Sequence, residues 1–216
     1  MPDPLLPPES GPENRAVPRN AAAATRAALR RAGIVAREAL GASEHRRLSM
    51  ALEARLQPLL QRCQPRIVGF CWPIRGEFDC RPLAAQLIGQ GVSCCLPRVV
   101  AQEMTLTFHA WRPDSVMEID RFGIHTPSDG ALLVPDLLLI PVNVFDAAGY
   151  RLGYGAGYFD RTLAALTPRP LTIGVGFELA RVASIGPAWH DVPLDAVATE
   201  AGIEIFSGRF PAERAG

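Results

Sequence analysis

Residues 146–161 read DAAGYRLGYGAGYFDR, a run with glycine at every second position from 153 to 157. A short apolar run at 135–141 precedes it and is typical of a buried strand. A helix is predicted after it, from Phe159 to Leu166, because Pro168 would interrupt a longer one. The predicted order is therefore a strand, a glycine-rich loop and a helix.

This order favours a phosphate site. Glycines take backbone angles closed to other residues, so successive N–H groups of the loop can turn toward one concavity. The following helix adds the positive end of its dipole, and Arg151 and Arg161 add full positive charges. Asp160 is unusual in a pure anion site, and a carboxylate beside phosphates indicates a magnesium ion between them. The alternative is a glycine-rich turn whose Asp is simply favoured near a helix start.

The loop differs from two common phosphate loops. It lacks the Gly-Lys-Ser/Thr of a Walker P-loop, and its glycines are too evenly spaced for the G-x-G-x-x-G of a dinucleotide site. It closely resembles the signature of 5-formyltetrahydrofolate cyclo-ligases, also called methenyltetrahydrofolate synthetases, which has the form F-D-x-x-G-x-R-L-G-x-G-x-G-Y-[YF]-D-R. The positions that fit are Phe145, Asp146, Gly149, Arg151, Leu152, Gly153, Gly155, Gly157, Tyr158, Phe159, Asp160 and Arg161. The resemblance extends over about residues 22–203.

The resemblance implies an ATP-dependent enzyme that converts 5-formyltetrahydrofolate and ATP into 5,10-methenyltetrahydrofolate, ADP and phosphate, with magnesium as cofactor. It assigns ATP binding to Arg26, Arg30, Arg151, Leu152, Gly153, Tyr154, Gly155, Ala156, Gly157, Tyr158 and Phe159. It assigns folate binding to Trp72, Glu77, Tyr154, Gly155, Ala156, Gly157 and Tyr158. Catalysis would rest on Arg151, Tyr158 and Asp160, and the metal on Asp160 and Asp191. Most of the rate would come from positioning and charge neutralisation, as in other phosphoryl transfers.

Arg26 and Arg30 lie in a helix predicted from Ala21 to Leu40, and their spacing of four places them on one face. Such a basic face is often only solvated. The resemblance favours an anion there, because the family begins with a basic K-x-x-x-R helix that contacts ATP phosphates. Arg26 stands where the family usually has Lys, which keeps the charge and changes the geometry.

Glu77 follows a predicted strand at 66–72, in the kind of position where α/β sheets place ligands. Without the resemblance it would be read as a residue that precedes the next helix. The family has W/Y-x-P-x-x-x-E-x-D here, and Trp72, Pro73, Glu77 and Asp79 fit it. The resemblance places Glu77 on the folate, where a carboxylate can accept two N–H bonds from an amino-pyrimidinone edge. Asp191 would be a turn residue if the resemblance were ignored.

The alternation of predicted helices and apolar strands indicates one α/β domain at 21–206, with a mostly parallel, Rossmann-like sheet and helices on both faces. The proline-rich residues 1–20 are expected to form a disordered tail, and 207–216 a frayed end. Finer expectations concern four side chains. Ser43 is expected to cap a second helix that runs to about Leu60, Phe108 and Trp111 to line an apolar groove, and His125 to face solvent in a turn.

The composition indicates which partners and which cellular compartment to expect. The net charge is zero, which implies no strong attraction to nucleic acid or membranes. No signal peptide or membrane span is recognisable, and five cysteines without a C-x-x-C pair indicate free thiols in a reducing cytoplasm. We expect a monomer.

Two other functions stay open. A regulatory relative without activity is suggested by Arg26, Thr126 and Ala180, which replace the family's usual Lys, Glu and Gln. A generic dinucleotide-binding module is disfavoured by the glycine spacing.

Overall fold

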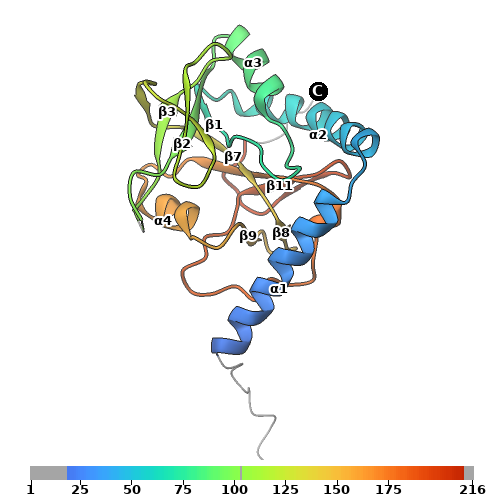
Figure 1. The fold of residues 1–216 in the computed structure, drawn as a ribbon. Coiled ribbons are helices and arrows are strands. Elements are labelled where there is room, and N and C mark those ends of the chain that lie inside the picture. The colour runs from blue at the N-terminus through green and yellow to red at the C-terminus, as the bar shows by residue number, and fades with distance from the viewer. Residues whose placement is uncertain (1–18, 103, 212–216) are drawn as a thin grey trace, which may run out of the picture.

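The structure is a computed structural model that describes residues 19–102 and 104–211 (Figure 1). The helices are α1 (Arg19–Glu38), α2 (Ala42–Cys63), α3 (Arg81–Gly89) and α4 (Tyr158–Ala165), with a short 3-10 helix η1 (Glu178–Ala180). The strands are β1 (Ile67–Gly69), β2 (Ser93–Arg98), β3 (Thr107–Ala110), β4 (Met117–Ile119), β5 (His125–Pro127), β6 (Leu132–Leu133), β7 (Leu137–Pro141), β8 (Val144–Phe145), β9 (Arg151–Leu152), β10 (Leu171–Val175), β11 (Ala196–Ala198) and β12 (Ile203–Ile205). In the ranges that the structure describes, no helix is both long and apolar enough to span a membrane.

Eight strands form one sheet in the order β12-β11-β10-β7-β1-β2-β3-β6. The strands from β11 to β2 are parallel, whereas β12, β3 and β6 add to the edges antiparallel. The chain passes from β1 outward to β2 and later returns to place β7 on the other side of β1. The strand order therefore reverses between β1 and β7, and at such a switch point the carboxyl ends of the strands leave a crevice for a ligand.

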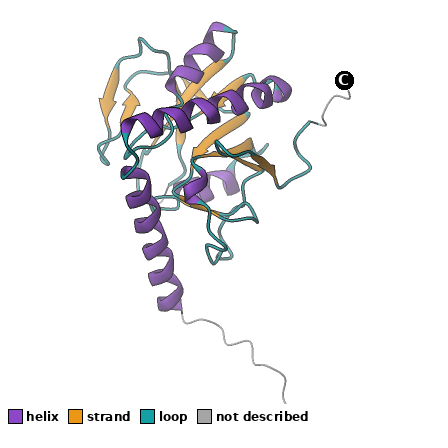
Figure 2. Ribbon diagram, turned by 90° about the vertical axis from the view of Figure 1, so that its right-hand side faces the viewer, coloured by secondary structure: helices purple, strands orange, loops and turns teal. Residues whose placement is uncertain are grey.

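Both faces of the sheet are covered, as the sequence of β7 requires. Leu137 and Leu139 point into a core shared with the buried side chains of α2 and α3, and Leu138 and Ile140 point into a second core shared with Leu163 of α4. Burial on both sides explains why this strand is a continuous apolar run and not an alternating one. Figure 2 shows α2 lying across one face. The predicted α/β domain, with a mostly parallel sheet and helices on both faces, is confirmed.

Helix α1 packs against β8 at Gly33, where the approach leaves no room for a side chain. A Cβ atom at this position would lie 2.3 Å from the backbone oxygen of Asn143 and 2.8 Å from a methyl group of Val144. From this contact the amino-terminal part of α1 extends beyond the sheet (Figure 2). Positions 26, 30, 33 and 37 are spaced i, i+4, i+7 and i+11, so they share one face of the helix.

A small hairpin that the sequence did not predict, β8 with β9, separates β7 from the glycine loop. Asp146 holds its turn, because one carboxylate oxygen accepts the N–H groups of Ala148 and Tyr150 and the other accepts that of Ile185. The predicted order of strand, loop and helix is otherwise confirmed, with α4 directly after the loop.

The expected start of the second helix is wrong. α2 begins at Ala42 with Gly41 as its N-cap, so Ser43 lies inside the first turn. Gly41 takes the extended conformation that an N-cap needs, and its carbonyl accepts the N–H of His45. Of the predicted tail at 1–20, residues 1–18 lie outside the described part of the chain, and 19 and 20 belong to α1. Of the predicted frayed end at 207–216, residues 212–216 lie outside the described part.

Candidate active site

A pocket of about 520 Å³ lies at the switch point, at the carboxyl ends of β1, β2 and β7. Its walls come from the inner face of α1, the segment after β1, strand β5, the glycine loop with the start of α4, and the chain at 190–191. The pocket is lined by all the residues that the sequence assigned to the site, namely Arg26, Arg30, Trp72, Glu77, Arg151, Leu152, Gly153, Tyr154, Gly155, Ala156, Gly157, Tyr158, Phe159, Asp160 and Asp191. The fold thus brings together residues from four distant segments, while their individual roles remain proposals.

The glycine loop requires glycine at two of its positions. Gly155 has φ of 103° and Gly157, the N-cap of α4, has φ of 68°, and both angles belong to the left-handed region. No side chain in the described ranges caps α4, so its first N–H groups are available to a ligand. Arg161, which was expected to add charge to the site, instead donates to the Ala156 carbonyl at 2.8 Å and lies over the Tyr158 ring. Arg161 therefore braces the loop.

Arg30 is the cation that faces this loop. Its guanidinium carbon would lie 3.5 Å from a Cβ atom at Gly155. Its Nε atom is buried and has no hydrogen-bond partner in the described chain. Burial lowers the pKa of Arg30, the like charge of Arg26 adds to this, and Asp191 opposes it. A half-buried arginine with an unused donor is a good partner for an anion such as phosphate.

Arg26 already has an anionic partner, Asp191. Its two terminal nitrogens donate to the two carboxylate oxygens at 2.7 and 2.9 Å, and one of them also donates to the Gly186 carbonyl at 3.1 Å. Burial alone would raise the pKa of Asp191, but Arg26 and the N–H of Ala188 hold it below its usual value. This ion pair fastens the loop before β11 to α1 at the edge of the pocket.

Asp160 stands in the first turn of α4 and is held from two sides. It accepts a hydrogen bond from Arg151 and one from the backbone N–H of Val192, both at 3.1 Å. Arg151 also donates to the Val192 carbonyl at 2.7 Å. Burial lowers the pKa of Arg151, and Asp160 opposes this. Because Val192 follows Asp191, the two carboxylates proposed for magnesium belong to one connected cluster.

Glu77 enters the pocket from the loop after β1 and is buried. Its Oε1 atom accepts a hydrogen bond from the Tyr154 hydroxyl at 2.9 Å, and its Oε2 atom accepts the backbone N–H of Ile74 at 3.1 Å. Burial raises the pKa of Glu77, although Ile74, Arg37 and Tyr154 all oppose the rise. Burial and the nearby carboxylate also raise the pKa of the Tyr154 phenol well above its ordinary value. Each oxygen of Glu77 keeps a lone pair that a ligand can use.

Sequence reasoning missed Arg37, which contacts both of these residues. One terminal nitrogen donates to the Tyr154 hydroxyl at 3.0 Å and lies 3.9 Å from the Glu77 carboxylate. The other donates to the side-chain oxygen of Asn143 at 2.7 Å. Helical spacing could have revealed Arg37, because it follows Arg30 by seven residues and so continues the same basic face.

One wall of the pocket is aromatic. The ring centroid of Trp72 lies 4.8 Å from that of His125, and the Arg81 guanidinium lies 4.4 Å from the Trp72 ring. Phe122 meets Tyr158 edge to face at 5.9 Å. The expectation that His125 faces solvent in a turn is wrong, because it is half-buried in β5 and lines the pocket. Pairing of β5 with β4 turns its ring onto Trp72.

The expectation that Phe108 and Trp111 line the groove is also wrong. Their exposed fractions are 3% and 5%, and neither borders the pocket. Trp111 packs edge to face on Phe70 at 5.1 Å, and Phe108 belongs to the core that contains Leu163. Each of the two side chains is therefore part of one of the two cores and not of the pocket wall.

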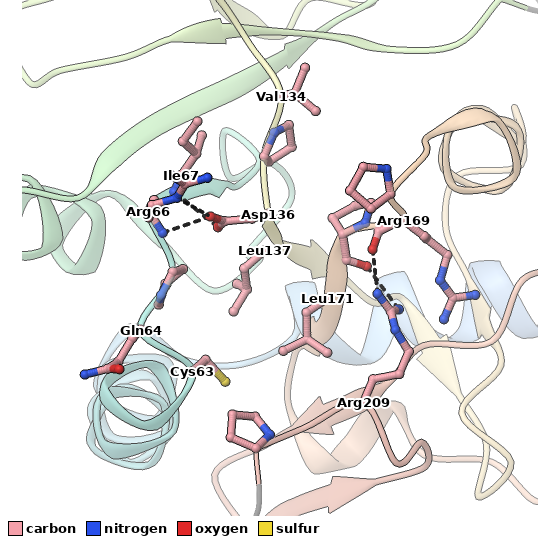
Figure 3. A pocket seen from close by; sticks show the side chains of 15 residues that line it. Cys63, Gln64, Arg66, Ile67, Val134, Asp136, Leu137, Arg169, Leu171 and Arg209 are labelled. Atoms are coloured by element: carbon pink, nitrogen blue, oxygen red, sulfur yellow. Dashed lines mark hydrogen bonds and ion pairs between the residues drawn. The ribbon is translucent and has the colours of Figure 1, made fainter.

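A second pocket, of about 600 Å³, lies at the opposite ends of the strands, where β1, β7 and β10 begin (Figure 3). Its polar groups bind mainly to the protein. Asp136 accepts the backbone N–H groups of residues 66 and 67. Arg209 donates to the Pro170 carbonyl at 3.2 Å and to the buried Asp195 at 2.8 Å, and Arg169 donates to Asp195 at 3.1 Å. The glycine loop and Arg30 are absent from this pocket, so the first pocket is the candidate active site.

Comparison with known proteins gives one family. The family model described as 5-formyltetrahydrofolate cyclo-ligase family matches residues 22–200. The 5-formyltetrahydrofolate cyclo-ligase of Escherichia coli (strain K12) is 33% identical over 131 residues, which are 57% of this chain and 72% of that protein. The enzyme of the same name from Haemophilus influenzae is 29% identical over 145 residues, which are 63% of this chain and 76% of that protein.

A solved structure agrees with this family. The NMR structure of Aquifex aeolicus 5,10-methenyltetrahydrofolate synthetase matches with a TM-score of 0.74 at 27% identity, over 88% of this chain and 96% of that one. The likeness thus covers most of the chain, and not the glycine loop alone. Because the family model also spans most of the chain, the protein belongs to the 5-formyltetrahydrofolate cyclo-ligase family.

Proposed function

We propose that the protein converts 5-formyltetrahydrofolate and ATP into 5,10-methenyltetrahydrofolate, ADP and phosphate. The observation that carries this proposal is that one pocket holds the glycine loop and Arg30 together with Glu77 and Trp72. The first pair suits a triphosphate, and the second suits the amino-pyrimidinone edge and flat ring of a pterin. A cyclo-ligase needs both substrates in contact, and a single pocket supports that contact.

The reaction explains why no protein nucleophile is required. The formyl oxygen of the substrate attacks the γ-phosphorus of ATP, and ADP leaves. The phosphorylated oxygen is now a good leaving group on an electrophilic carbon. N10 attacks this carbon, gives up its proton and closes the ring, and phosphate departs with the former formyl oxygen. Catalysis then depends on alignment of the two substrates and on neutralisation of the phosphate charge.

Each part of the pocket has a proposed task in this sequence. The N–H groups of the glycine loop and of the start of α4, where Tyr158 stands, hold the β- and γ-phosphates together with Arg30. Arg151 keeps Asp160 in place from behind, because its guanidinium group is buried and bonds that carboxylate. Glu77 binds the pterin edge and fixes the formyl group against the γ-phosphate.

Magnesium fits this site in the kind of ligands offered. No group of three His, Cys, Asp or Glu side chains converges as a metal site in the described residues. Magnesium bound to a nucleotide, however, takes only one or two carboxylates and receives its other oxygens from phosphates and water. Asp160 and Asp191 would be these carboxylates, and Arg26 would then give up part of its hold on Asp191. When bound, the ion supplies positive charge to the phosphates during transfer.

We further propose that the protein works as a monomer in the cytoplasm. All the site residues proposed above come from one chain, so this proposed site needs no residue of a second copy. The cysteines at 63, 71, 80, 94 and 95 are free, and burial raises the pKa of Cys94 and Cys95 to about 12, so these thiols are protonated and inert, as suits a reducing compartment.

Turnover by the purified protein tests the proposed function. With both substrates and magnesium, ADP and the methenyl product should appear one for one, the product being visible by its near-ultraviolet absorbance. Neither substrate should react alone, and 10-formyltetrahydrofolate should not support ATP use, because its formyl group occupies the nitrogen that must attack. ATP hydrolysis that ignores folate would contradict the proposal. Folate binding without any product would instead indicate a regulatory relative.

A further inference from the structure

We propose that Arg37 is a positioning residue of this site, which aligns Glu77 with Tyr154 and thereby joins the folate side of the pocket to the glycine loop. This inference rests on the proposed function, in which Glu77 binds the pterin. Arg37 does not line the pocket, and its exposed fraction is 4%. It would therefore act through its neighbours and not on a substrate.

The contacts of Arg37 reach three segments at once. Its terminal nitrogens donate to Tyr154 in the glycine loop at 3.0 Å and to Asn143, just after β7, at 2.7 Å. Its Nε atom donates to the backbone carbonyl of Arg75 at 2.9 Å. Tyr154 in turn donates to Glu77. A rigid guanidinium fork can hold all of these partners in one plane, which a flexible ammonium group cannot.

The turn that carries Glu77 is built around this fork. Arg75 has φ of 51° and Gly76 has φ of 73°, so two successive residues adopt left-handed angles. For Arg75, which has a side chain, such an angle is uncommon and requires support from its surroundings. The hydrogen bond from Arg37 to the Arg75 carbonyl gives this support at the strained residue itself. A second bond, from the ring of His45 to the Gly76 carbonyl at 2.9 Å, secures the next peptide.

The charge of Arg37 also favours the ionised form of Glu77. The groups that face this carboxylate are Arg37 from α1, Tyr154 from the glycine loop, the N–H of Ile74, and the thiols of Cys71 and Cys80. Among them Arg37 carries the positive charge. Burial raises the pKa of Glu77, and the hydrogen bond from Ile74, the charge of Arg37 and the hydrogen bond from Tyr154 all favour the carboxylate form, which the pterin needs as acceptor.

The test is the pH dependence of kcat/KM for 5-formyltetrahydrofolate, measured at saturating ATP. Arg37→Gln should move the acid limb of this profile upward by about 1–3 pH units, the range expected when an opposite charge within about 4–6 Å of a carboxylate is lost. In Arg37→Lys the acid limb should lie close to its wild-type pH. Tyr154→Phe should move it in the same direction as Arg37→Gln, because the bridging hydroxyl is lost. Glu77→Gln should remove the limb, which identifies the group that titrates.

Glu38→Gln is the matched control. Glu38 is the next residue of α1 and pairs with the exposed side chain of Arg75 at 2.7 Å, so the variant disturbs the same turn without touching Glu77. Its acid limb should stay in place. If Arg37→Gln or Tyr154→Phe lowers activity equally at every pH and leaves the limb unmoved, Arg37 has only a structural role and the inference fails. Absence of product with wild-type protein would overturn the proposed function itself, and the inference with it.

Discussion

Replacement of Arg26 by Ala should raise the KM for ATP about 10- to 100-fold. The side chain donates two hydrogen bonds to Asp191, at 2.7 and 2.9 Å, on the wall that also carries Arg30. A hydrogen bond to a charged group contributes about 1.5–3 kcal/mol, and each 1.4 kcal/mol is a factor of about ten in affinity. The expected rise in KM therefore corresponds to the loss of one such bond to ATP. Arg26 would either make this bond to a phosphate itself or hold Asp191 where Asp191 contributes to ATP binding. Arg26→Lys keeps the charge but not the fork, so we expect a smaller rise, within about tenfold.

The assay is the near-ultraviolet absorbance of the methenyl product at varied ATP and saturating folate. Arg31→Ala is the matched control, because Arg31 lies on the exposed face of the same helix. A double-mutant cycle of Arg26→Ala with Asp191→Asn shows how Arg26 acts. We expect the two effects to be non-additive, since the residues are bonded to each other. An unchanged KM for ATP in Arg26→Ala would refute the reasoning. Arg26 would then serve only to hold the loop that carries Asp191.

The remaining predictions address three carboxylates. Asp160→Asn keeps the shape of the side chain and removes its charge, so turnover should be almost lost while the Tm is retained. The measurement is the rate in a magnesium titration, and a wild-type rate, especially at low magnesium, would contradict the metal role. Glu77→Gln should raise the KM for folate about 10- to 100-fold and leave that for ATP unchanged, because one charged hydrogen bond is lost; equal weakening of both would point to a structural role. Burial alone would raise the pKa of Asp195, but Ser207, Thr172 and Arg209 hold it below its usual value. Its contribution to stability is therefore complete above the unfolded pKa of about 3.9 and is lost as the pH falls through the lower folded pKa. Asp195→Asn should lower the Tm at neutral pH and flatten that acid dependence in a series of melts, and an unchanged acid dependence would show that other groups cause it.

The features that could be predicted from the sequence are those that depend on neighbouring residues. The apolar run of β7, the glycine spacing from 153 to 157 and the breaker Pro168 together specified the strand, the loop and α4. The pattern of helices and strands was enough for the fold class. The signature also selected residues that line one pocket, because a shared motif carries information about distant contacts that local spacing does not.

The features that could not be predicted depend on which distant element covers a side chain. Phe108 and Trp111 are apolar and suit a groove as well as a core, and only the distant side chains that pack on them decide between the two. His125 looks like a polar turn residue until β4 and β5 pair and bring it to Trp72. The ion pair of Arg26 with Asp191 joins residues that are 165 positions apart, and no local pattern indicates it.

Because α1 touches β8 so closely at Gly33, a tilt of the helix about this contact would move its distant residues most. Arg26 precedes this contact by seven residues, a distance of about 10 Å along a helix that rises about 1.5 Å per residue. A tilt of about 10° at the contact would then displace Arg26 by about 2 Å, which is enough to break its bonds to Asp191. Arg37, four residues on the other side, would move only about 1 Å. A side chain introduced at Gly33 would therefore separate Arg26 from Asp191 and leave the contacts of Arg37 nearly in place.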